Sequence, residues 1–99
     1  MIIIWDNGPV RRFPSGQLLA TPAAMDALTK AGDDPRSFLC RHLAGEWGDL
    51  TDDDKLANEA ALRDGDRVLS SYRISTGEEL WVITEADRSA TTLLLPSDY

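Results

Sequence analysis

The chain has 99 residues and a formal net charge of -7, and 42% of its residues are hydrophobic. A chain this short builds one core, so we expect a single domain over residues 1–99, and the apolar content excludes intrinsic disorder. The negative charge repels phosphates and anionic headgroups, so neither nucleic acid nor a membrane is expected as a direct ligand.

The N-terminal apolar run, residues 2–5, is stopped by Asp6 and has no basic region before it, unlike a signal peptide. We therefore expect a cytoplasmic protein. The β-branched and aromatic residues of this run, closed by turn-forming residues 6–9, predict a first strand. Residues 17–20 predict another short extended piece. The single cysteine, Cys40, excludes an internal disulfide.

Three helices are predicted next, each from its cap. Thr21 and Asp34 each precede a proline, which suits the first position of a helix because proline has no N–H to satisfy. Thr51 precedes three aspartates, and carboxylates are favoured at a helix N-terminus. The predicted helices cover residues 22–31, 35–44 and 52–64.

The hydrophobic period changes from helical to two after residue 66. Val68, Ser70 and Tyr72 alternate with Leu69 and Ser71, which is typical of a strand with two different faces. The turn signals predict an antiparallel meander of strands over residues 67–74, 80–84 and 90–95. The sequence therefore predicts the α+β class, with short helices packed on one face of this sheet.

Three segments resemble a family of short proteins carried by plasmids and integrative elements. They are FLCRH at residues 38–42, GEWGD at residues 45–49 and WVITEADRSATTLLLP at residues 81–96. The similarity covers about residues 17–99, and its members are often labelled type I restriction endonuclease subunit M or plasmid-related protein. The chain has neither the cofactor loop nor the Pro-Pro motif of such a methyltransferase, so the resemblance implies a mobile-element setting rather than methylation.

That setting suggests an anti-defence role. Small acidic proteins of mobile elements are similar in size and charge to antirestriction and anti-CRISPR inhibitors, some of which bind a host defence complex. Asp49, Asp52 and Asp53 are the first candidate binding residues, because their carboxylates could imitate phosphates, and Trp47 joins them because tryptophan is enriched at binding hot spots. The alternative is a solvated helix face whose acids complement the helix dipole.

The loop Glu85–Ser89 is the densest polar cluster of the chain. Glu85, Asp87 and Arg88 are candidate binding residues, since loops held by a sheet often carry function. The alternative is a structural turn in which Asp87 accepts from Ser89 or from a backbone N–H and Arg88 pairs with Glu85 at the surface.

An enzymatic alternative rests on the one histidine of the chain, His42. With Arg41, Arg73 and Arg88 it could perform ribonuclease chemistry, with imidazole as acid or base and guanidinium groups stabilising a phosphorane. The layout of helices before a meander is similar to barnase and RelE-like toxins. The competing interpretation makes His42 a half-buried structural residue that caps the core and whose ring nitrogen bonds a backbone carbonyl.

No metal ligand set or cofactor loop is recognisable, so no cofactor is expected. We expect a non-enzymatic protein that binds another protein. A third alternative is a dimerising module that buries Trp81, Ile83 or Leu94 of the free sheet face against a second copy.

Overall fold

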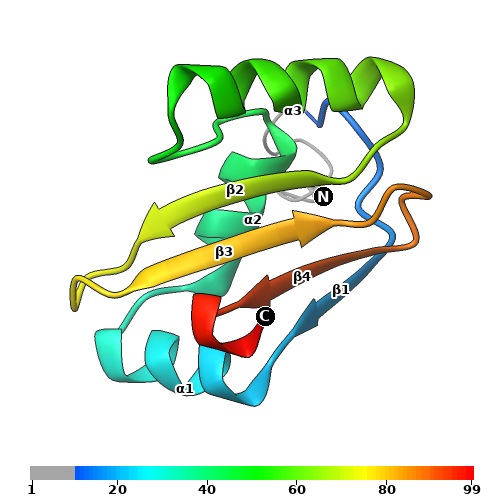
Figure 1. Cartoon of the computed structure of the whole chain (residues 1–99). Coiled ribbons are helices and arrows are strands. Elements are labelled where there is room, and N and C mark those ends of the chain that lie inside the picture. Colours follow the sequence, from blue (N-terminus) through cyan, green and yellow to red (C-terminus); the bar gives the residue numbers. More distant parts are fainter. Residues whose placement is uncertain (1–10) are drawn as a thin grey trace, which may run out of the picture.

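The computed structural model describes residues 11–99, so the strand predicted at residues 2–5 lies outside the described residues. Its elements in chain order are shown in Figure 1: β1 (Gln17–Ala20), α1 (Pro22–Ala31), α2 (Pro35–Leu43), α3 (Asp52–Asp64), β2 (Val68–Arg73), β3 (Glu79–Thr84), β4 (Ala90–Leu94) and the 3-10 turn η1 (Pro96–Asp98). The α+β class is confirmed.

The helix starts follow the predicted capping chemistry. The side chains of Thr21, Asp34 and Thr51 accept hydrogen bonds from backbone N–H groups two or three residues further on, which satisfies donors that the helix leaves free. The bounds of α1 and α3 are those predicted, and α2 ends one residue earlier, at Leu43. Local chemistry therefore decides where each helix begins.

The sheet has four strands in the order β1-β4-β3-β2. The meander of β2, β3 and β4 is antiparallel as predicted. However, β1 pairs with β4 in parallel, from Gln17 opposite Ala90 to Ala20 opposite Leu93, so the sheet is mixed and the purely antiparallel prediction is corrected. All three helices lie in the chain between β1 and β4, so no hairpin forces these two strands to be antiparallel.

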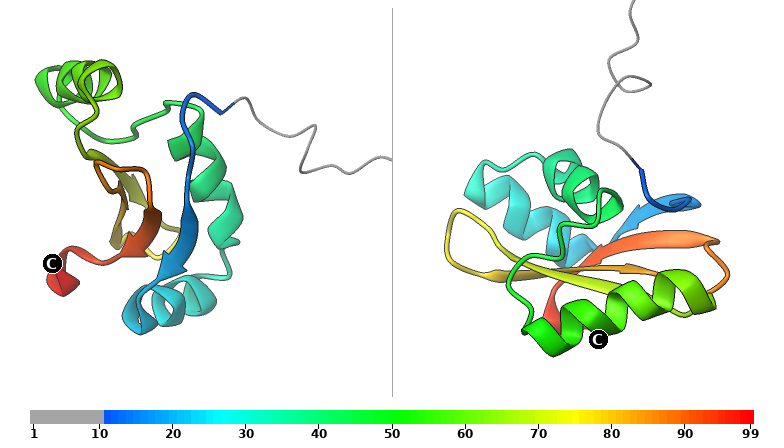
Figure 2. Two further views of the ribbon diagram at one scale, coloured as in Figure 1. Left: turned by 90° about the vertical axis from the view of Figure 1, so that its right-hand side faces the viewer. Right: turned by 90° about the horizontal axis from the view of Figure 1, so that it is seen from above.

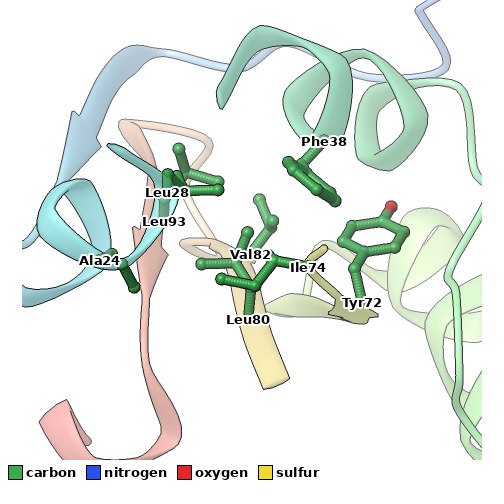
Figure 3. Packing of buried hydrophobic residues seen from close by; sticks show 9 residues of the cluster. Ala24, Leu28, Phe38, Tyr72, Ile74, Leu80, Val82 and Leu93 are labelled. Atoms are coloured by element: carbon green, nitrogen blue, oxygen red, sulfur yellow. The ribbon is translucent and has the colours of Figure 1, made fainter. Parts of the chain in front are cut away.

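The sheet divides the molecule into two unequal sides. Helices α1 and α2 lie on one side, whereas η1 lies on the other and α3 runs along the outer edge of β2 (Figures 1 and 2). The main core lies under α1 and α2, where Leu28 and Phe38 meet Leu80 and Val82 (Figure 3). A second cluster joins α3 to the sheet through Ala61 and its neighbours.

The outer edge of β2 is covered at Leu69 and Ser71. The Asn58 side chain of α3 donates to the carbonyl of Leu69 at 2.7 Å and accepts from its N–H at 3.2 Å, as a neighbouring strand would. Two residues further along, Ser71 exchanges backbone hydrogen bonds with Trp47 and Asp49. Hence α3 and the segment before it replace a fifth strand.

Gly48 makes this close approach possible. Its φ is +79°, and a Cβ atom built at this position would lie 1.9 Å from the carbonyl oxygen of Ser71. Only glycine fits here, because any side chain would collide with the backbone of the strand that the segment covers.

Within residues 11–99, no helix is both long enough and apolar enough to cross a membrane.

Candidate functional site

His42 lies on α2 and is fully buried between the helix and the sheet. The rings of Phe13 and Trp47 meet its imidazole edge-on, with centroid distances of 5.4 and 5.8 Å. Both ring nitrogens nevertheless have partners, Ser70 Oγ at 2.5 Å and Thr84 Oγ1 at 2.9 Å. The imidazole therefore joins α2 to β2 and β3.

A chain of hydrogen bonds continues from His42 and fixes its tautomer. Thr91 donates to the carbonyl of Ser15 at 2.8 Å, so its oxygen is free to accept from the Thr84 hydroxyl at 2.7 Å. Thr84 then accepts from His42 Nε2–H, which leaves Nδ1 as the acceptor for Ser70. Each hydrogen bond of the network thus has one donor and one acceptor.

The environment keeps this histidine neutral. Burial disfavours the charged imidazolium and lowers the pKa of His42 from 6.5 to about 3. A general acid or base must reach the proton that it transfers, and this ring is enclosed by aromatic side chains and bonded at both nitrogens. The surroundings are those of a structural histidine.

The three candidate arginines do not share a pocket with His42. Arg41 lies over the ring of Tyr72, 4.4 Å from its centroid. Arg73 pairs across the sheet with Glu79 at one end of β2, and its guanidinium donates to the carbonyl of Gly77. Arg88 follows the opposite end of β3 and donates to the carbonyl of Asp66 at 2.7 Å.

The predicted binding residues fall into two separated groups. Asp49, Asp52 and Asp53 are exposed just before and within the first turn of α3. Arg88 contacts the carbonyl of Ala61 near the other end of that helix. Because a helix rises about 1.5 Å per residue, the two groups lie roughly 12 to 14 Å apart along α3.

Trp47 is buried, and its contacts stabilise the fold. Its indole N–H donates to Glu59 Oε2 at 3.0 Å, and Arg12 donates to both oxygens of the same carboxylate at 2.6 and 2.7 Å. These hydrogen bonds, first from Arg12 and then from Trp47, lower the pKa of Glu59 to about 2. Arg12 and Trp47 are thereby both bound to α3.

The loop Glu85–Ser89 has the contacts of a turn. The Asp87 carboxylate accepts from the Ser89 N–H at 3.0 Å. The Ser89 side chain, and then this backbone N–H, lower the pKa of Asp87. Arg88 adopts a positive φ of 61° and donates to carbonyl groups of its own loop and of the α3 end. Glu85 and Asp87 are exposed beside this anchored arginine.

The residues of the dimer alternative share the sheet face opposite α1 and α2. Trp81 pairs with Leu94, and Ile83 lies on the same side of β3. Ile83 and Leu94 are already buried, and Trp81 is half-buried with its ring 5.7 Å from that of Tyr99. The C-terminal turn thus covers part of this face (Figure 2). In the part of the chain that the structure describes, no group of three His, Cys, Asp or Glu side chains could hold a metal.

The edge of β1 is the feature that the sequence did not single out. Gln17 donates its N–H to the carbonyl of Ser89 just before β4, and Thr21 donates to Leu93 of β4, so by alternation Leu18 and Ala20 turn their N–H groups outward. Among residues 11–99, no hydrogen-bond partner meets the outward N–H and C=O groups of Leu18 and Ala20. Within the described part of the chain, this edge is therefore open to pairing.

Apolar side chains surround this open edge. Leu18, Leu19 and Met25 are exposed at 50%, 42% and 40%, which is unusual for neighbouring large side chains. Beside them lie two adjoining grooves, of about 280 and 170 Å³, that share Leu18 and Leu39 in their walls. The edge strand, the exposed side chains and the grooves form one surface, which we call the β1 surface.

Comparison of the chain with protein-family models, with curated proteins and with solved structures finds no match.

Proposed function

We propose that the protein is a non-enzymatic accessory protein that acts by binding another protein, with the β1 surface as its main contact. The observation that carries this proposal is the open edge of β1 beside exposed Leu18 and Leu19. Unpaired strand edges next to apolar side chains favour addition of a strand from a partner, because backbone hydrogen bonds and side-chain burial are then gained together.

The charge of the chain supports a positively charged partner. A net charge of -7 attracts a basic protein over the distance of a Debye length and speeds the encounter, even where the contact itself is apolar. Exposed Asp49, Asp52 and Asp53 contribute to that field. The resemblance to mobile-element proteins makes a host defence complex our proposed partner, which would give the protein an anti-defence role.

The proposal is tested by affinity capture from a host lysate with three forms of the tagged protein. They are the wild type, Leu18→Lys, and the control Leu56→Lys, which adds the same charge to a more exposed leucine of α3. A stoichiometric partner retained by the wild type and by Leu56→Lys but lost by Leu18→Lys is expected. Equal retention by all three forms would contradict a contact through β1.

The ribonuclease alternative requires a separate assay. Buried, neutral His42 argues against it, so purified protein is expected to leave RNA intact. RNA cleavage that disappears in His42→Gln, with the fold retained, would favour that alternative over the proposed function.

A further inference from the structure

We infer that the β1 surface binds an extended peptide segment with two apolar side chains two residues apart and a carboxylate at the end next to Arg11. This inference rests on the proposed function and specifies the chemistry of the partner. It follows from the spacing of the open backbone groups, from the two grooves and from the distribution of charge around them.

The backbone of β1 sets the conformation and length of the ligand. Leu18 and Ala20 each offer an outward N–H and C=O, and they are two residues apart. Strands rise about 3.3 Å per residue, so the two sets of groups are roughly 7 Å apart. An added strand places alternate side chains on the same face at that same interval. A segment of about four to five residues is long enough to use both positions.

Two adjoining grooves lie beside these open backbone groups. The larger lies between Leu18 of β1 and Leu39 and Leu43 of α2. The smaller continues along the edge past Leu19, Met25 and Pro35. Their walls are mainly aliphatic, so each groove accepts an aliphatic side chain of the added strand, and the shared residues keep the two in one line.

Charge distinguishes the two ends of the surface. Arg11 and Arg36 line the larger groove, whereas the lining of the smaller one contains no charged side chain among the described residues. Arg36 already pairs with Asp34 at 2.8 Å. Arg11 is exposed and has no ion pair within residues 11–99, so it is the guanidinium that a carboxylate of the ligand would meet.

A second copy of the chain fits this surface less well. The β1 strand contains no acidic residue to meet Arg11, because its sequence is QLLA. Two strands of four residues also bury far less than the roughly 1,200 Å² that a stable dimer requires. Of these two occupants, the surface favours a foreign extended segment.

Fluorescence anisotropy with short synthetic peptides tests the inference on the full chain. The first peptide carries Glu followed by Ile-Thr-Val, the second replaces Glu with Lys, and the third has the order Ile-Val-Thr, which breaks the two-residue spacing. The first is expected to bind about tenfold more tightly than the third, since misplacing one aliphatic side chain loses the burial of about two CH₂ groups. Lys in place of Glu is expected to weaken binding about threefold, the effect of one exposed ion pair.

Two variants assign the effect to this surface. Leu18→Lys is expected to weaken the first peptide at least about tenfold, whereas Leu56→Lys on α3 leaves it unchanged. Arg11→Ala is expected to remove the preference for Glu over Lys and to keep the preference for alternating side chains. Equal binding of all three peptides, or binding unaffected by Leu18→Lys, would overturn the inference.

The outcomes separate this inference from the proposed function. If no peptide binds but Leu18→Lys still abolishes capture of the cellular partner, the function stands and the peptide chemistry is wrong. If the peptides bind as expected but capture does not depend on Leu18, the peptide chemistry stands and the function fails. A dimer of the free protein that Leu18→Lys dissociates would overturn the inference in favour of a second copy.

Discussion

The two edges of the sheet differ in whether their outward backbone groups are hydrogen-bonded. At β2, Asn58 bonds both backbone groups of Leu69, and the segment around Gly48 bonds those of Ser71. At β1, the corresponding groups of Leu18 and Ala20 have no partner in the described residues. Proteins commonly protect exposed strand edges against association, and here one edge is protected by several independent contacts. The difference indicates that the open edge is available for use.

Of the substitutions at the β2 edge, the one at Gly48 is expected to have the largest effect. Gly48→Ala places a Cβ against the Ser71 carbonyl at a left-handed φ, so we expect a loss of at least about 3 kcal/mol in the free energy of unfolding. The control is Gly65→Ala, which has a φ of +76° but open space around it. Denaturant unfolding of both separates the collision from the backbone strain. Equal losses in the two variants would mean that the close approach at Gly48 does not exist.

Removing Asn58 opens the second edge. Asn58→Ala leaves the N–H and C=O of Leu69 without their partners, and a loss of about 2 kcal/mol is expected. The variant should also associate more readily than the wild type, as followed by light scattering. Leu56→Ala, on the exposed side of the same helix, should change stability by less than about 0.5 kcal/mol. No difference between the two variants would show that the Asn58 contact does not protect the edge.

Acid is expected to lower the stability of the fold through His42. The folded pKa of about 3 lies below the ordinary value of 6.5, so below pH 6.5 the unfolded chain binds a proton that the folded chain does not. Stability is fully present above pH 6.5 and falls with decreasing pH, by up to about 1.4 kcal/mol per pH unit, until the folded pKa is reached. NMR of the chain's only histidine should show no titration between pH 8 and pH 5. A midpoint near 6.5 would refute the buried network.

Hydrogen exchange compares the two edges without a substitution. The amides of Leu69 and Ser71 donate to Asn58 and Trp47, so they should exchange more slowly than the outward amides of Leu18 and Ala20. Mass spectrometry or NMR at neutral pH measures the rates. Similar protection at both edges would mean that something covers β1 in solution.

Much of the fold could be predicted because its signals are local. Capping residues and prolines mark the helix starts, and the change to a period of two marks the meander. The parallel pairing of β1 with β4 could not be predicted, because a four-residue strand carries no signal of its partner or direction. The role of Asn58 could not be predicted either, because one amide in an amphipathic helix does not reveal which backbone groups it meets.

The candidate site was harder to predict because burial depends on tertiary structure. His42 and its partners carried one usable signal: Ser70, Thr84 and Thr91 are polar residues on inward-facing strand positions, which predicts that something polar satisfies them. The acidic candidates could be placed on the surface, but their separation along α3 depends on the fold. The β1 surface arises only when strands and helices from distant parts of the sequence meet.

The pairing of Gln17 with Ala90 has a consequence for synthesis in the cell. The strand β1 is made before β4, its only strand partner in the described fold, and the paired residues Gln17 and Ala90 are 73 positions apart in the chain. Until β4 has been made, β1 lacks this partner. Contacts this distant in sequence also slow folding, because the intervening chain must be ordered before they form. Pairing of β1 in the nascent protein therefore waits for β4.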